Sequence, residues 1–259
     1  MLHEKIYLRE DKTAYVTTYI VDDPLELDRK RPVAVICPGG AYEFVSPREG
    51  EPVALAFNAA GFHAVVVNYR IKTLFPAALV DLSDAVCMVR NNAEKWRIDI
   101  DKVVVCGFSA GGHLAASLGV FYDRESAIIN AGGLNKPNGM ILCYPVITSD
   151  INAHKGSIRN IAGDNEKIAR KLSLEKQVTA SCPPAFIWHS FTDAIVPVQN
   201  SIYMAQALTD NQIPIELHIF PNGPHGMSAA NEYVAECEDG DRPEVHAWLK
   251  MAVDWINNL

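Results

Sequence analysis

The chemistry of this chain starts with Ser109, which lies in Gly107-Phe108-Ser109-Ala110-Gly111, a G-x-S-x-G match. Three valines at 103–105 precede it and mostly small, apolar residues follow it, which predicts a buried strand, a sharp turn and a helix. Glycine is needed at 107 and 111, because side chains there would collide where the strand and the helix converge. The motif alone is weak evidence, since its residues are common. In this context it predicts a serine hydroxyl held at the end of a strand.

Two further polar residues follow predicted strands: Asp193 comes after residues 185–188, and His225 comes after residues 215–220. The carboxyl ends of parallel strands meet at one edge of a sheet, so we expect both residues near Ser109. A serine hydroxyl attacks well only when a base takes its proton, and an imidazole does this best when a carboxylate orients it. We therefore predict Ser109 as nucleophile, His225 as base and Asp193 as orienting acid. Taken singly, Asp193 is also typical of a turn, and His225 of a solvated loop.

Attack by a serine creates a negatively charged tetrahedral oxygen, which needs backbone N–H donors held in place. Loss of one such donor costs about 3 to 4 kcal/mol. The amide of Ala110, directly after the serine, is the first candidate. The turn Pro38-Gly39-Gly40-Ala41 follows a predicted strand at 33–37 and offers a second amide, from Gly40 or Ala41. These amides are predicted to form an oxyanion hole.

Two other histidines are rivals for the role of base. His113 comes four residues after Ser109 on the same predicted helix, so we expect it to pack beneath the turn. His189 comes at the end of a predicted strand and is expected to be either a structural residue or one that supports a catalytic residue without touching the substrate.

Strands separated by helices are predicted along the chain, and these elements must position the residues above. Strands are predicted at 33–37, 62–69, 103–106, 139–144, 185–188 and 215–220, and helices at 52–60, 78–96, 198–208 and 245–256. This alternation indicates an α/β fold with a mostly parallel central sheet and helices on both faces. Residues 6–21 are expected to add an antiparallel hairpin at the edge of the sheet.

The composition shows no boundary between domains, so residues 1–259 are predicted to form a single domain. Residues 149–182 interrupt the alternation, because they are polar, contain two glycines and show a charged, helix-like run at 166–176 without a clear strand. This segment is either a lid over the site or a surface excursion that covers nothing.

The bulk properties exclude several classes of protein. A net charge of −8 and the lack of basic runs argue against a nucleic-acid partner. The histidines and the six cysteines lack the spacings typical of metal sites, and no phosphate-binding glycine loop is present, so no metal or cofactor is expected. No stretch is long enough to span a bilayer, and Met1–Lys12 alternates charged and apolar residues, unlike a signal peptide. We therefore expect a cytoplasmic protein with no membrane partner.

With these residues assembled, the chain resembles the α/β-hydrolase superfamily. Within it, the chain is similar to acetyl esterases and acetylxylan-esterase-like carbohydrate esterases, relatives of the hormone-sensitive-lipase type. The matching segments are CPGGAYEF at 37–44, REGEPVA at 48–54, VVNYRI at 66–71, GFSAGGHLAASL at 107–118, YPVIT at 144–148, PPAFIWHSFTDAIVPVQNS at 183–201, ELHIF at 216–220 and GPHG at 223–226. The order Ser109, Asp193, His225 is also that of the superfamily.

The resemblance implies an α/β-hydrolase fold and the same roles for these three residues, with the Gly40 region and Ala110 as oxyanion hole. One departure leaves the donor amide open: related lipases carry His-Gly-Gly-Gly where this chain has Pro38-Gly39-Gly40-Ala41. Four aromatic residues lie near predicted strand ends: Tyr42, Tyr69, Tyr144 and Phe191. They are expected either to bind substrate, as a platform for a sugar or a pocket for the acyl group, or to belong to the core.

The function expected from the residues and the resemblance together is that of a serine esterase. It would hydrolyse short acyl esters, acetyl by resemblance, of carbohydrates or similar small alcohols, with an acetylated oligosaccharide among the small-molecule substrates. The same residues also suit a peptidase, a formamidase or a dienelactone-type hydrolase. A binding protein that keeps the fold without turnover is a further alternative. The oligomeric state is left open.

Overall fold

One mixed sheet forms the centre of the computed structural model, which describes residues 1–23, 27–235 and 240–259. The strands of this sheet lie in the order β1-β2-β4-β3-β5-β6-β7-β8. They are β1 (Lys5–Tyr7), β2 (Tyr15–Tyr19), β3 (Arg31–Cys37), β4 (His63–Asn68), β5 (Ile98–Phe108), β6 (Gly139–Cys143), β7 (Ala185–Ser190) and β8 (Ile215–Phe220). Strands β3 to β8 pair in parallel, whereas β1 and β2 form the antiparallel edge. The predicted fold class is confirmed.

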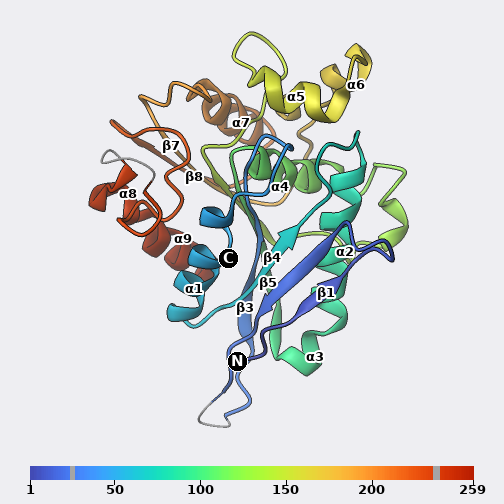
Figure 1. The fold of residues 1–259 in the computed structure, drawn as a ribbon, viewed down its shortest axis with the longest axis vertical. Coiled ribbons are helices and arrows are strands. Elements are labelled where there is room, and N and C mark those ends of the chain that lie inside the picture. The colour runs from blue at the N-terminus through green and yellow to red at the C-terminus, as the bar shows by residue number, and fades with distance from the viewer. Residues whose placement is uncertain (24–26, 236–239) are drawn as a thin grey trace.

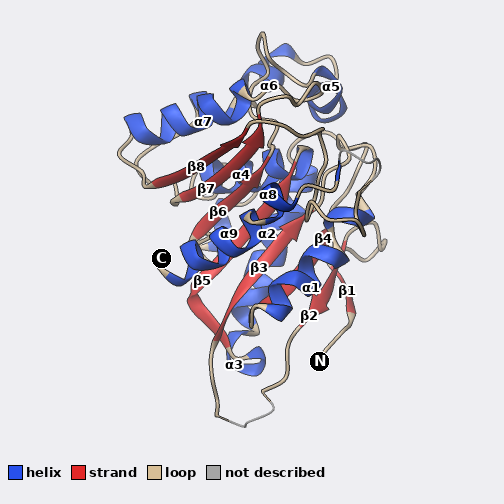
Figure 2. Ribbon diagram, turned by 90° about the vertical axis from the view of Figure 1, so that its left-hand side faces the viewer, coloured by secondary structure: helices blue, strands red, loops and turns tan. Residues whose placement is uncertain are grey.

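Helices cover both faces of the sheet (Figures 1 and 2). Apolar residues of α1 (Glu51–Ala59), α8 (Pro243–His246) and α9 (Trp248–Asn257) share one core with one face. The second core contains α2 (Ala77–Asn91), α3 (Ala93–Trp96), α4 (Ala110–Phe121) and α7 (Gln199–Asp210). Within the described residues, no helix combines the length and apolar composition needed to cross a bilayer.

The run of valines in β5 supplies both cores at once. Val103 and Val105 pack into the core that contains α4, while Val104 and Cys106 pack into the core that contains α1. Successive side chains of a strand point to opposite faces, so a strand covered on both sides must be apolar throughout. The uninterrupted apolar run before Ser109 follows from this central position.

The predicted helix at 78–96 is divided in the structure. Helix α2 ends at Asn91, and a separate short helix, α3, follows Asn92. The Asn92 side chain donates a hydrogen bond from Nδ2 to the carbonyl of Met88 at 2.8 Å, and its backbone leaves the helical region. Asparagine competes in this way with helix continuation, which the spacing of apolar residues does not reveal.

Residues 149–182 contain α5 (Lys155–Ala162), α6 (Glu166–Lys171) and a short 3-10 turn at Leu174–Lys176. Helices α5 and α6 lie at the end of the sheet where the parallel strands finish (Figure 2). The side chain of Asn160 in α5 donates to the carbonyl of Ala41 at 2.9 Å. This segment is therefore attached to the loop after β3, and its role as a lid stays a prediction.

Backbones of three elements meet closely around Ser109. A Cβ atom built on Gly107 would lie 2.2 Å from the carbonyl oxygen of Gly111. A Cβ atom on Gly111 would lie 2.0 Å from the carbonyl oxygen of Cys37, at the end of β3. Both contacts are with backbone, which cannot swing aside as a side chain can. The predicted need for glycine at both positions is confirmed.

We expect Gly111→Ala to destabilise the fold by at least about 3 kcal/mol, because the added methyl forces α4 away from β3. Urea unfolding measures this as a lower midpoint at unchanged slope. Gly156→Ala in α5 is the control: its Cβ meets nothing closer than 3.4 Å, so it should be neutral or stabilising. Equal midpoints for the two variants would contradict the close-packing argument.

Candidate active site

Ser109 occupies a strained turn between β5 and α4. Its φ and ψ are 53° and −118°, in a region that residues other than glycine rarely adopt. Its backbone N–H donates to the carbonyl of Cys143 at 3.0 Å, and its own carbonyl accepts from His113 and Val146 at 3.1 and 3.0 Å. These bonds hold the strained conformation and fix the direction of the side chain.

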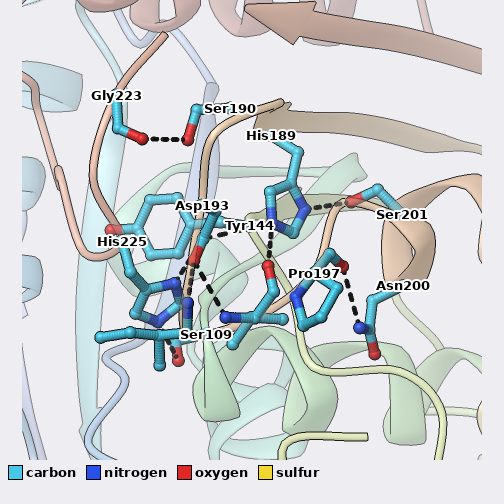
Figure 3. A network of polar contacts seen from close by, with 12 residues as sticks. Ser109, Tyr144, His189, Ser190, Asp193, Pro197, Asn200, Ser201, Gly223 and His225 are labelled. Carbon is cyan, nitrogen blue, oxygen red and sulfur yellow. Dashed lines mark hydrogen bonds and ion pairs between the residues drawn. The ribbon is translucent and has the colours of Figure 1, made fainter. Parts of the chain in front are cut away.

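The structure brings Ser109, His225 and Asp193 together in one hydrogen-bonded chain (Figure 3). Ser109 Oγ lies 2.8 Å from Nε2 of His225, and His225 Nδ1 lies 2.6 Å from Oδ2 of Asp193. A carboxylate can only accept, so Nδ1 carries a proton and Nε2 is left to accept from the serine hydroxyl. The arrangement suits removal of the hydroxyl proton by the imidazole.

Asp193 is held as a carboxylate beneath His225. Its Oδ1 accepts from the amides of Ile195 and Val196, both at 2.9 Å, and His189 Nε2 lies 3.3 Å from its Oδ2. Burial acts to raise the pKa of Asp193, but hydrogen bonds from His189 and His225 outweigh it and hold the pKa well below its usual range. His189 is itself fully buried, bonded to Ser201 and close to the Asp193 carboxylate, so it supports Asp193 and is not the base.

The amides predicted for the oxyanion hole come from two elements that meet beside Ser109. Gly40 and Ala41 line the same cavity of about 320 Å³ as Ser109 and His225. Ala110 is the first residue of α4, so its N–H has no acceptor within the helix. Within the described part of the chain, none of these three amides donates to another residue. The roles of Gly40, Ala41 and Ala110 stay predictions.

The comparison with known proteins identifies the chain. The family model BD-FAE matches residues 21–208. The chain belongs to the BD-FAE hydrolase-fold family. The acetyl ester-xyloside bifunctional hydrolase from Caldicellulosiruptor lactoaceticus is 32% identical, with a TM-score of 0.85 over 98% of this chain and 96% of that one. A carboxylesterase from Lactobacillus plantarum is 28% identical, with a TM-score of 0.88 over 100% and 98%.

Two curated proteins extend this set of relatives of the BD-FAE chain. An endo-1,4-beta-xylanase B from Butyrivibrio fibrisolvens is 39% identical over 79% of this chain. An acetylxylan esterase from Xylanibacter ruminicola is 30% identical over 94% of this chain. The aligned regions make up only 34% and 49% of these two relatives.

Glu49 is a residue of this BD-FAE protein that the sequence did not single out. It is only 3% exposed and its carboxylate accepts two hydrogen bonds, from the amide of Gly39 at 2.7 Å and from Tyr144 Oη at 2.6 Å. Tyr144 Oη in turn accepts from the amide of Ser228 at 2.8 Å, and its ring lies edge-on to His225. Glu49 therefore connects the loop after β3 to the loop that carries His225.

The position of Glu49 explains why sequence reasoning missed it. It lies in a single 3-10 turn, Pro47–Glu49, directly after the glycine-containing loop. An acidic residue in such a turn is usually solvated. Only the folded structure shows that Gly39 and Tyr144 surround it.

For the aromatic residues expected to form either a substrate platform or core, the structure supports core in three of the four cases. The three tyrosines are buried, with exposures of 2% for Tyr42, 2% for Tyr69 and 1% for Tyr144. Their hydroxyls are bonded to His113, Pro38 and Glu49 respectively. A ring packed in the core cannot stack on a sugar, so these tyrosines belong to the core around the site. Phe191 is 67% exposed, but it does not line the cavity that contains Ser109.

Other residues line this cavity instead. Phe44 and Ile195 contribute apolar side chains that are 56% and 57% exposed, and His154 enters from residues 149–182. No sequence pattern marks these three, because they come from separate loops. Among the residues described, no group of three or more His, Cys, Asp and Glu side chains is arranged to hold a metal ion.

We expect Glu49→Gln to destabilise the protein by about 1 to 3 kcal/mol. The new amide group must face either the Gly39 N–H or the Tyr144 hydroxyl, which leaves one buried donor without an acceptor. Urea unfolding at pH 7 measures the change. Glu51→Gln is the matched control, because Glu51 accepts from one tyrosine hydroxyl, Tyr19 Oη, but is exposed. A loss no larger in Glu49→Gln than in this control would contradict the role of burial.

His113 packs beneath the Ser109 turn, as predicted. It is 1% exposed, Nε2 donates to the carbonyl of Leu172 at 3.0 Å, and Nδ1 accepts from Tyr42 Oη at 2.9 Å. Burial lowers its pKa from 6.5 to about 4. Between about pH 4 and 6.5, His113 is therefore neutral in the folded protein but charged in the unfolded chain.

This difference makes stability depend on pH. Between about pH 6.5 and 4 the unfolded chain binds the extra proton, so the contribution of His113 is complete above 6.5 and is lost as pH falls. The slope is at most about 1.4 kcal/mol per pH unit. We expect His113→Gln, which can keep both hydrogen bonds, to flatten the decline between pH 7 and 5. If the free energy of unfolding falls equally in both proteins from pH 7 to 6 and 5, this expectation is wrong.

Proposed function

We propose that this protein is a serine esterase that removes short acyl groups, foremost acetyl, from carbohydrates or similar small alcohols. The observation that carries the proposal is the hydrogen-bonded chain from Asp193 through His225 to Ser109, opening into a cavity lined by Gly40 and Ala41. The names of the BD-FAE family's relatives support the acyl group, since acetylxylan esterase and acetyl ester hydrolase stand among them.

In the first half of the proposed reaction, Ser109 Oγ attacks the ester carbonyl carbon while His225 Nε2 takes the hydroxyl proton. Asp193, already ionised and bonded to Nδ1, stabilises the imidazolium. The carbonyl oxygen becomes an oxyanion, which accepts from the amide of Ala110 and an amide of Gly40 or Ala41. The C–O bond to the alcohol then breaks, and His225 returns its proton to the departing oxygen.

In the second half, water replaces the alcohol. His225 takes a proton from the water as it attacks the acyl carbon of the Ser109 ester. The tetrahedral intermediate collapses, the serine oxygen regains a proton from His225, and the carboxylic acid leaves. The protein ends unchanged, so the cycle needs no cofactor.

The size of the cavity supports the proposal of a short acyl group. At about 320 Å³ it lies at the small end of the range for ligand sites, which favours an acetyl group with one sugar unit over a long acyl chain. Two sequence predictions accompany this proposal: a single domain over residues 1–259, with 149–182 as lid or insertion, and a cytoplasmic location.

A substrate panel tests the function. We expect acetyl esters, as 4-nitrophenyl acetate and acetylated xylo-oligosaccharides, to give the highest kcat/KM, with lower values for butyryl and octanoyl esters and for aminoacyl amides. Ser109→Ala should lower kcat by at least about 10³-fold and abolish labelling by a fluorophosphonate, because no other hydroxyl is bonded to His225 in the described residues.

Ser126→Ala is the control for this test, because Ser126 is exposed and bonded to Glu125, away from the cavity. It should keep full activity and labelling. Preference for amides or for octanoyl esters would overturn the acetyl-esterase assignment. Folded wild-type protein that neither labels nor hydrolyses any ester would indicate a binding protein.

A further inference from the structure

His154 is a polar residue in the cavity to which the proposed reaction gives no role. It immediately precedes α5 and lines the same cavity as Ser109, Gly40 and His225. Its position is fixed by its neighbours in α5, because Asn160 donates to the carbonyl of Ala41 and the carbonyl of Ile161 accepts from the amide of Phe75 at 2.7 Å. The histidine is thus held at a constant place relative to residues 38–41, the loop after β3.

The hydrogen bonds of His154 define where its proton lies. Nδ1 accepts from the Ser157 amide at 3.3 Å and pairs with Ser157 Oγ at 2.8 Å, so it caps the first turn of α5. An Nδ1 that accepts an amide proton leaves the ring proton on Nε2. Burial, and then the nearby His225, lower the pKa of His154, which keeps the ring neutral. Within the described residues, nothing accepts from Nε2.

The proposed reaction leaves one class of acceptor for this donor. The carbonyl oxygen of the ester is directed to the amides of the oxyanion hole, and an acetyl methyl has no acceptor. The oxygens that remain belong to the alcohol. Phe44 and Ile195 present partly exposed apolar surface in the same cavity. Apolar surface beside a single N–H donor suits a sugar ring, which has C–H faces and hydroxyl groups at its edge.

Building on the proposed esterase function, we propose that His154 Nε2–H donates to a hydroxyl or ring oxygen of the departing sugar. The protein is therefore selective for acetyl esters of polyhydroxylated alcohols over those of simple aryl alcohols. His154 is a substrate-binding residue in this assignment, and residues 149–182 contribute specificity through it.

The test compares His154→Asn with wild type on two acetyl esters. Asparagine is a good helix cap and can still accept from the Ser157 amide, but its shorter side chain withdraws the donor from the cavity. We expect kcat/KM for an acetylated xylo-oligosaccharide to fall about tenfold, mainly through a higher KM. For 4-nitrophenyl acetate, whose alcohol carries no hydroxyl, kcat/KM should stay within about twofold. His154→Gln, whose longer amide carries a donor, should recover part of the loss.

The control changes a different helix cap in the same segment. Asn165 caps α6, accepts from Lys167 and Ile168 amides, and does not line the cavity, so Asn165→Ser should leave both substrates unchanged. Equal losses on both esters in folded His154→Asn would assign His154 to holding the loop and overturn the proposal. No loss on either ester would also overturn it. Failure of wild type to hydrolyse any ester would instead reject the esterase function itself.

Discussion

The structure depends on the close packing of three backbones, those of β5, α4 and β3, at Gly107, Gly111 and Cys37. Because no side chain fits between them, α4 begins directly at the end of β5 and forces Ser109 into a strained turn. The same packing brings the start of α4 and the loop after β3 together beside the serine. Ser109 and the amides proposed as oxyanion donors are thus positioned by backbone contacts, which are more rigid than side-chain contacts.

Two buried carboxylates, those of Asp193 and Glu49, hold the other loops around Ser109 in place. Asp193 accepts two backbone amides in its own loop and bonds His225 from the next loop. Glu49 accepts from Gly39 and from Tyr144, whose hydroxyl accepts from Ser228. A buried carboxylate is costly unless its oxygens are bonded, so each loop conformation that provides the donors is strongly preferred.

The sequence predicted the fold class and the meeting of Ser109, Asp193 and His225 because both follow from patterns along the chain. Apolar runs mark the strands, and parallel strands end at one edge, so residues after them converge. The burial of a side chain in a loop leaves no such pattern in the sequence. Glu49 has the sequence context of a solvated acid, and Tyr42, Tyr69 and Tyr144 have one that suits a pocket or core equally, but the structure buries all four. The break in the predicted helix at Asn92 was missed because a local side-chain hydrogen bond leaves no trace in the spacing of apolar residues.

In the proposed assignment, residues 149–182 set the preference for the alcohol without altering the chemistry at Ser109. Ser109, Asp193 and His225 follow strands β5, β7 and β8 of the central sheet, whereas His154 comes from a segment that contains no strand among its described elements. The segment is attached to the loop after β3 through a hydrogen bond from Asn160 to the Ala41 carbonyl, so this bond does not engage the Ala41 amide. A change in this segment therefore alters the wall that meets the alcohol while the strained turn and the buried carboxylates stay in place.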